Sequence, residues 1–71
     1  MYVCDYTDDE IRALTLKAGE FEFAPENVLR VKADGSWVAL NDGEVERTGS
    51  DRASAVAFLL EVREEYRRDM E

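Results

Sequence analysis

Residues 28–48, VLRVKADGSWVALNDGEVERT, decide the fold, because two Asp-Gly pairs separate three stretches of alternating apolar and polar residues. Asp34-Gly35 and Asp42-Gly43 are each typical of a two-residue hairpin turn, in which both central residues adopt positive φ. The sequence therefore predicts a three-stranded antiparallel meander, with strands at about 28–33, 36–41 and 44–48.

The predicted register gives this sheet two unequal faces. If the first turn has two residues, Val31 pairs with Val38, and the second turn pairs Leu40 with Val45. One face then carries only apolar side chains and needs a helix to cover it; these are Leu29, Val31, Val38, Leu40 and Val45. The other face carries Arg30, Lys32, Trp37 and Glu46. On that polar face Trp37 is either stacked against a cation or free to anchor a partner.

A C-terminal helix at about 51–68 is the predicted cover. Gly49-Ser50-Asp51 offers a helix cap. Helical spacing then places a broad apolar stripe along one side, made of Ala55, Leu59, Val62 and Tyr66 with Val56, Phe58 and Leu60 beside it. The charged residues of the opposite side are expected to face solvent, namely Arg52, Glu61, Glu64, Arg67 and Arg68.

The N-terminal part predicts a second helix at about 8–18. Thr7 and Glu10 form a capping box, and Gly19 suits a helix end. Residues 1–5 are open to a short strand, and residues 20–23 to a brief strand or an extended linker that ends at Pro25. The whole chain, 1–71, is thus expected to be a single compact α+β domain.

Composition favours a folded intracellular protein. The 71 residues suffice for one domain, and the 45% hydrophobic content indicates a packed core. One cysteine, Cys4, allows no internal disulfide. Residues 1–10 lack the basic and apolar regions of a signal peptide, and the longest apolar run, 55–60, is too short to span a membrane. We expect a cytoplasmic protein, in the host cytoplasm if a phage encodes it.

The net charge of −8 restricts the partners. Residues 1–27 contribute 2 − 7 = −5 of it through seven acids, here called the front acids: Asp5, Asp8, Asp9, Glu10, Glu20, Glu22 and Glu26. Affinity for phosphates and anionic lipid comes mainly from Lys and Arg. We therefore expect no direct binding of nucleic acid or membrane, and favour a basic protein partner. Solubility or salt adaptation is the alternative reason for the acidity.

Catalytic chemistry finds no support in the sequence. The chain has no histidine, which removes the commonest general base and most zinc sites. Cys4 lacks a histidine or cysteine partner and is expected to be a small core residue. Neither a Ca²⁺ loop nor a glycine-rich phosphate loop is present. We expect no enzyme, no catalytic residue, no metal and no cofactor.

The leading functional hypothesis is an inhibitor that acts by charge mimicry. In size, charge and lack of catalytic groups the chain resembles the anti-defence inhibitors of phages and mobile elements, including anti-CRISPR proteins. That resemblance implies a basic partner such as a nuclease or another nucleic-acid-binding complex, blocked by a DNA mimic. The front acids and Trp37 are the predicted partner-binding residues.

Two alternatives belong to other classes. Residues 34–39 and 49–55 resemble the HicB-type antitoxin domain, where a hairpin leads to a glycine-aspartate helix start, although this chain lacks that domain's proline-containing loop and has a preceding helix. The resemblance implies a regulatory function beside a toxin. The second alternative is a structural accessory protein that forms a homodimer through the sheet face around Trp37.

Overall fold

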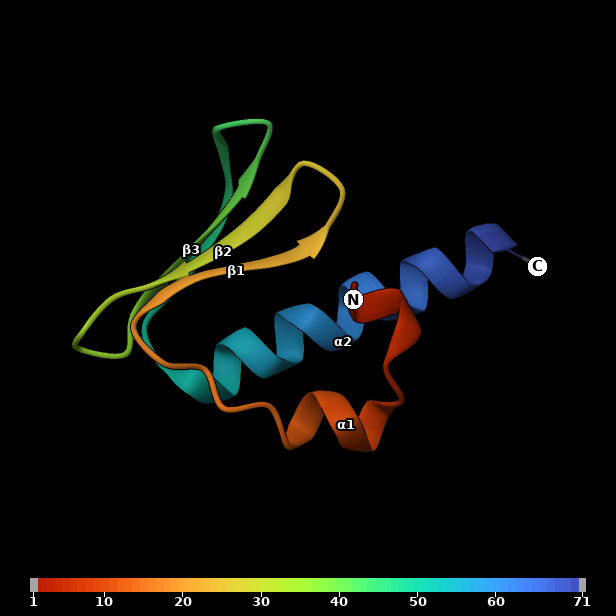
Figure 1. The fold of residues 1–71 in the computed structure, drawn as a ribbon, viewed down its shortest axis with the longest axis horizontal. Helices are drawn as coiled ribbons and strands as arrows, with labels where there is room; N and C mark the ends of the chain where they lie inside the picture. Colours follow the sequence, from red (N-terminus) through yellow and green to blue (C-terminus); the bar gives the residue numbers. More distant parts are fainter. Residues whose placement is uncertain (1, 71) are drawn as a thin grey trace.

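The computed structural model describes residues 2–70 and has two layers. One layer is an antiparallel sheet whose strands lie in the order β1-β2-β3-β4, with bounds Gly19–Ala24, Asn27–Val31, Trp37–Asn41 and Glu44–Gly49. The other layer is the long helix α2, Arg52–Met70, which lies along one face of the sheet (Figure 1). A 3₁₀ turn, η1 (Val3–Asp5), and a short helix, α1 (Asp8–Arg12), pack beside α2. The predicted α+β class and the sheet-plus-helix arrangement are confirmed.

Between β2 and β3 the hairpin closes at the pair Lys32–Ser36, so its loop has three residues, 33–35, and not two. The amide of Gly35 donates to the carbonyl of Lys32 at 3.0 Å, and the amide of Lys32 donates to the carbonyl of Ser36 at 2.8 Å. Gly35 has φ 90°, as the third residue of such a loop requires. Asp34 stabilises the loop, because its carboxylate accepts from the amide and the hydroxyl of Ser36 at 3.0 and 2.6 Å.

This extra residue exchanges the faces of β3. Val31 pairs with Trp37, so the register differs by one residue from the predicted one. Side chains alternate along a strand, and a slip of one residue therefore moves every side chain of β3 to the other face. Leu29 and Val31 face α2 as predicted. The placement of Val38, Leu40 and Val45 on that face is wrong: Val45 is 65% exposed, and the helix side of β3 is formed by Trp37 and Ala39.

Trp37 is a core residue, and the prediction that it lies on the polar face is wrong. Its side chain is 2% exposed. Its ring stacks on Phe58 of α2, with centroids 5.3 Å apart. The indole N–H donates to the carbonyl of Asp51 at 3.1 Å and to the hydroxyl of Ser54 at 2.9 Å. Burial of an indole needs such a partner, and the first turn of α2 supplies it.

Gly49 is required by the same contact. It pairs with Trp37 across β3 and β4, and a Cβ at this position would lie 2.3 Å from the indole ring. The absent side chain allows the ring to lie flat over the end of β4. The chain then turns directly into α2, whose cap is Asp51 as predicted: its carboxylate accepts from the amide of Ser54 at 2.8 Å.

The second hairpin follows the prediction at its turn. Asp42 and Gly43 have φ 51° and 85°, the two positive values of a type I′ turn. Asn41 pairs with Glu44 and Leu40 with Val45, as expected. A bulge then pairs Ala39 with Arg47 in place of Glu46.

The fourth strand, β1, arises from residues that the sequence left open between strand and linker. Phe21 pairs with Leu29, and the strand ends at a tight turn in which Pro25 is followed by Glu26 at φ 66°. Proline at the first central position and a positive φ at the second are typical of a type II turn. Phe23 is 1% exposed and meets Phe58 edge to face, with centroids 5.5 Å apart.

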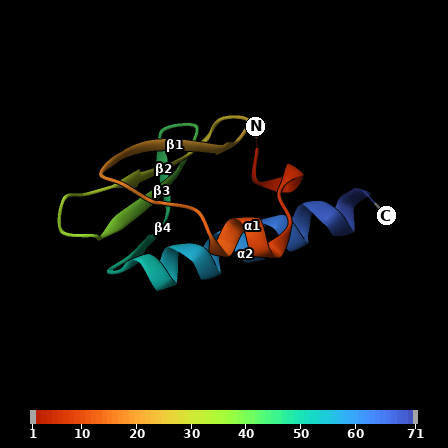
Figure 2. The same cartoon turned by 60° about the horizontal axis from the view of Figure 1, so that its bottom comes forward.

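The hydrophobic core lies between the sheet and α2 (Figure 2). The predicted stripe of α2 is confirmed, since Ala55, Val56, Phe58, Leu59 and Val62 are buried and Leu60 and Tyr66 pack against them. Residues from the N-terminal segment complete the core, chiefly Val3 and Ile11, which are fully buried. Within residues 2–70, no helix is long and apolar enough to cross a bilayer.

Helix α1 is much shorter than the predicted 8–18. The capping box is present, with Thr7 and Glu10 bonded reciprocally at 3.0 and 3.2 Å. The helix ends at Arg12 because the side chain of Arg52 donates to the carbonyls of Arg12 and Leu14, at 2.8 and 2.5 Å, in place of further helical amides. The extended chain that follows brings both Leu14 and Leu16 against the core.

The sequence left open a short strand at residues 1–5, but the structure has a 3₁₀ turn at Val3–Asp5. The amide of Asp5 donates to the carbonyl of Tyr2 at 2.9 Å, and that of Tyr6 to the carbonyl of Val3 at 3.1 Å. This turn directs Val3 into the core beside α2. Gly19 does not end a helix but begins β1. Residue 1 lies outside the described residues.

Candidate functional site

Three of the seven front acids are held in ion pairs. Asp8 lies 2.9 Å from Arg63 of α2, Asp9 lies 3.2 Å from Arg12, and Glu20 lies 2.9 Å from Arg30 on the neighbouring strand. These carboxylates are partly neutralised within the molecule. They contribute less field to a partner than the sequence count suggests.

Three further front acids have local structural partners. Glu10 closes the capping box of α1, and the carboxylate of Asp5 accepts from the amide of Tyr2 at 3.3 Å. Glu22 accepts a hydrogen bond from the phenol of Tyr2; this bond, together with the negative charge of Glu22, raises the pKa of that phenol. The front acids are therefore dispersed over η1, α1 and β1 and do not form one surface.

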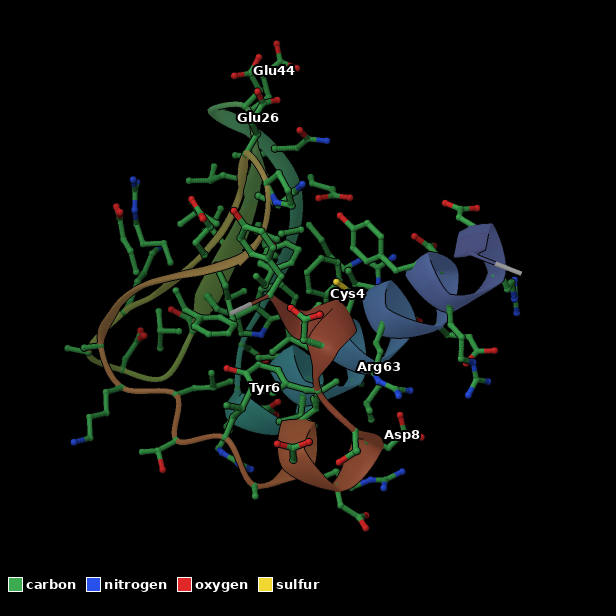
Figure 3. The ribbon with its side chains drawn as sticks, turned by 45° about the vertical axis from the view of Figure 1, so that its right-hand side comes forward. Cys4, Tyr6, Asp8, Glu26, Glu44 and Arg63 are labelled. Carbon is green, nitrogen blue, oxygen red and sulfur yellow. The ribbon has the colours of Figure 1, made fainter. Side chains whose placement is uncertain are left out.

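Glu26 is the front acid that belongs to a larger acidic region. Its carbonyl accepts from the amide of Asp42 at 2.8 Å, which joins the β1–β2 turn to the β3–β4 turn. Glu26 and Glu44 consequently lie at the same end of the sheet (Figure 3). Both turns are exposed, so their carboxylates face solvent together.

Two shallow hollows connect this end of the sheet to α2. One, of about 380 Å³, is lined by Asn41, Asp42, Glu44, Val45 and Glu46. The other, of about 180 Å³, is lined by Phe23, Asn27, Asn41, Glu46, Val62, Glu65, Tyr66 and Asp69. They share Asn41 and Glu46, and neither lining contains a Lys or an Arg.

We name the region defined by these contacts the turn-end surface. It comprises six carboxylates from both turns, from β4 and from α2: Glu26, Asp42, Glu44, Glu46, Glu65 and Asp69. In the described part of the chain, none of the six takes part in an ion pair, whereas five other acids do. The turn-end surface is the largest uncompensated group of charges that residues 2–70 bring together.

The electrostatic effect of this region reaches Tyr66. Its phenol pKa is raised, first by burial and then by neighbouring negative charges, which include Glu46, Glu65 and Asp69. Three carboxylates from two different elements thus act on one ring. The arrangement favours positive charge and disfavours any further anion.

The sequence alone missed five of the six turn-end acids. Asp42 is predicted as a turn residue, Glu44 as the first residue of a strand, and Glu46 as part of the polar face. The available signal was the Phe21–Pro25 segment: once it is taken as a strand that turns back into β2, the Glu26 turn must lie beside the Asp42 turn. The contribution of α2 could not be read in this way, because it depends on the helix direction across the sheet.

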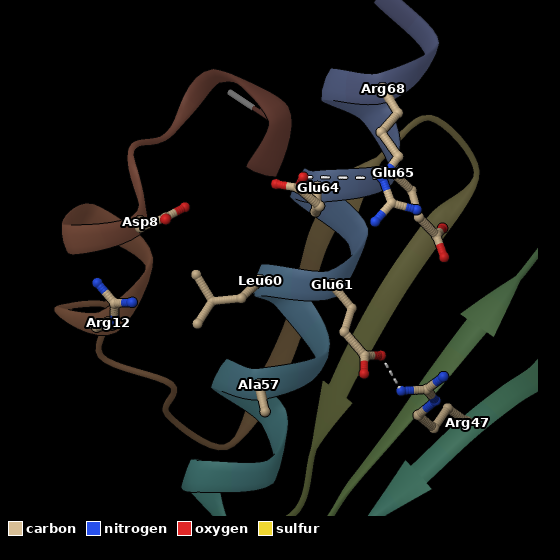
Figure 4. Close-up of a pocket in the computed structure, with 9 residues that line it drawn as sticks. All are labelled: Asp8, Arg12, Arg47, Ala57, Leu60, Glu61, Glu64, Glu65 and Arg68. Atoms are coloured by element: carbon tan, nitrogen blue, oxygen red, sulfur yellow. Dashed lines mark hydrogen bonds and ion pairs between the residues drawn. The ribbon is translucent and has the colours of Figure 1, made fainter.

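A wider hollow of about 750 Å³ lies between α1, α2 and β4 (Figure 4). Its lining combines four acids with three arginines around Leu60 and Ala57. The charges pair with one another: Arg47 contacts Glu61 at 2.5 Å, and Arg68 lies 3.9 Å from Glu64. No buried side-chain N or O atom of the described residues lacks a hydrogen-bond partner. Among the charged residues of this lining, only Glu65, which also belongs to the turn-end surface, forms no ion pair within residues 2–70.

Groups for metal binding or nucleophilic chemistry are not assembled in residues 2–70. No three His, Cys, Asp or Glu side chains of this part are placed to hold a metal ion. Cys4 is half-buried beside Tyr66. Trp37, predicted as a partner anchor, is buried and cannot serve as one without unfolding. The turn-end surface remains the candidate site.

Comparison with protein-family models, curated proteins and solved structures finds no match to the chain.

Proposed function

We propose that the protein is an acidic interaction module that binds a basic partner through the turn-end surface. The observation that carries the proposal is the segregation of charge: the acids elsewhere are largely paired or used in caps, while six at one end are not. Unpaired carboxylates keep their full field and need not break internal ion pairs when a cation approaches.

The partner that fits best is a nucleic-acid-handling protein. Such proteins carry basic grooves that neutralise phosphates, and a rigid array of carboxylates competes for the same groove. The bound state would exclude nucleic acid, which is inhibition by charge mimicry. A phage or mobile element that encodes an anti-defence inhibitor would use this activity against a nuclease such as a CRISPR effector.

The test compares two variants with equal charge. The first neutralises the turn-end surface by Glu→Gln and Asp→Asn at residues 26, 42, 44, 46, 65 and 69. The second neutralises six front acids, at residues 5, 8, 9, 10, 20 and 22. Each changes the net charge from −8 to −8 + 6 = −2. A partner captured from the native host is then tested for binding and for its ability to hold duplex DNA.

We expect the turn-end variant to lose partner binding and the competition with DNA, and the front variant to keep most of both. Wild-type binding should weaken steeply with salt, because the contacts are between charges. Equal losses in the two variants would mean that net charge alone determines binding, and would contradict the assignment of the turn-end surface as the binding site. Unchanged binding in both variants would contradict the charge-mimicry mechanism. Thermal unfolding of each variant, followed by circular dichroism, checks that the fold persists.

A further inference from the structure

The outer face of the sheet, which α2 does not cover, has an apolar centre. Paired positions place Val28, Leu40 and Val45 in one row across β2, β3 and β4, and Val38 in the adjacent row beside Arg30 and Thr48. None of these four aliphatic side chains belongs to the core or packs against it. Figures 1 and 2 show α1, α2 and η1 all on the opposite side.

Exposure on this face is unusual for the molecule. Val45 is 65% exposed, and within residues 2–69 it is the one large hydrophobic side chain that is exposed to this degree. Val28, Val38 and Leu40 are half-buried and are not packed against the core. Four adjoining aliphatic side chains on a flat surface are the pattern of an interface core and not of a solvated sheet.

The charges of this face indicate which molecule would cover it. Alternation along β1 and β2 gives it Glu20 and Glu22 together with Arg30, so its formal charge is 1 − 2 = −1, while the whole chain carries −8. A basic partner gains little here from electrostatics. A second copy of the chain, repelled elsewhere by like charge, meets little repulsion on this face.

We propose that the outer face, with Val28, Val38, Leu40 and Val45 at its centre, is a homodimer interface. Two copies related by a twofold axis would stack their sheets about 10 Å apart and interdigitate the aliphatic side chains. The Glu20–Arg30 pair lies at the rim, where polar groups remain hydrated. Helix α2 of each copy stays outside the contact, and of the four central side chains only Val45 also lines a turn-end hollow.

The size of the face sets the strength of the dimer. Four strands about 4.8 Å apart and five residues long, at about 3.3 Å each, make a face of about 19 Å by about 17 Å. That is well below the roughly 800 Å² that each partner buries in a standard interface. The dimer is therefore reversible and dependent on concentration.

Sedimentation equilibrium from micromolar to millimolar protein tests the proposal. The test variant is Val38→Glu/Leu40→Glu, which charges the centre of the face. The matched control is Ala53→Glu/Ala57→Glu, which adds the same charge at exposed positions of α2. We expect wild type and control to dimerise toward millimolar concentration and the test variant to remain monomeric. A wild type that is monomeric throughout, or a test variant that still dimerises, would overturn the proposal.

Amide chemical shifts recorded over the same concentrations locate the contact. Shifts should concentrate at Val28, Val38, Leu40 and Val45, with α2 unaffected. Shifts confined to the open edge of β4 would assign self-association to edge pairing and reject the face. Because neither Val38 nor Leu40 lines a turn-end hollow, partner binding by Val38→Glu/Leu40→Glu separates the failure of this proposal from failure of the proposed function.

Discussion

The two faces of the sheet carry similar apolar side chains, but α2 covers only one of them. The helix side buries Leu29, Val31, Trp37 and Ala39, and the outer side leaves Val28, Val38, Leu40 and Val45 without a covering element. Hydrophobic content alone therefore does not distinguish inside from outside. What distinguishes them is Trp37, which is the one side chain of the sheet that reaches both an aromatic stack and two acceptors on α2.

Replacement of Trp37 tests this comparison most strongly. Trp37→Ala removes the stack on Phe58 and leaves a cavity, at a cost of about 3–5 kcal/mol in the free energy of unfolding. The free energy of unfolding of a domain of this size is about 5 kcal/mol or little more. We expect the variant to be largely unfolded by far-ultraviolet circular dichroism.

Leu40→Ala is the matched change on the outer face. At protein concentrations where copies do not associate, its cost should be within about 0.5 kcal/mol in urea denaturation, as for other surface substitutions. Similar costs for Trp37→Ala and Leu40→Ala would mean that the two faces do not differ as described.

A methyl group at Gly49 tests the close approach of the indole. Gly49→Ala places a Cβ 2.3 Å from a ring that the stack and two hydrogen bonds hold in place. Overpacking of this kind costs about 1–3 kcal/mol, measured as a lower urea midpoint. Gly35→Asn is the comparison: a Cβ there has no neighbour within 4 Å, so the change is opposed only by the strain of a φ of 90°, which is smaller for asparagine than for most other residues. A midpoint shift no larger at Gly49 than at Gly35 would contradict the contact.

The cap of α2 gives the smallest effect, a dependence of stability on pH. Hydrogen bonds from the amide and then the hydroxyl of Ser54 lower the pKa of Asp51 below its ordinary 3.8. The folded state thus binds fewer protons than the unfolded state near this pH. The stabilisation is present above 3.8 and is lost as the pH falls through the lower folded pKa.

Asp51→Asn should flatten this part of the pH profile while leaving neutral stability nearly unchanged, because asparagine caps helices almost as well. Urea unfolding at a series of acidic pH values measures the profile, and carboxyl resonances give the pKa directly. An Asp51 carboxyl that titrates at or above 3.8 would contradict the cap geometry. Asp34, whose pKa Ser36 lowers in the same way, provides an internal comparison on the far loop.

Local signals in the sequence predicted elements well where a few neighbouring residues suffice. The Asp42-Gly43 turn, the Thr7–Glu10 box, the Asp51 cap and the stripe of α2 need only adjacent residues, and all four are confirmed. The same local reasoning made α1 too long, because the signal that ends it is the side chain of Arg52, forty residues away. Local reasoning also did not show that the front acids are divided among separate ion pairs and caps, because partners such as Arg63 and Arg30 are distant from them in sequence.

Turn residues, caps and periodicity act over a few residues, so the α+β class, the strong negative charge and the positions of β2, β3, β4 and α2 follow from the amino-acid sequence. The inward side of β3 depends on tertiary contacts, since Val38 and Leu40 suit burial as well as Trp37 and Ala39 do. A loop of three residues and an indole N–H that needs acceptors on α2 made the choice. Sheet pairing brings Glu26 beside Asp42, and only the packing of α2 against the sheet brings Glu65 to the same end, beside Asn41 and Glu46.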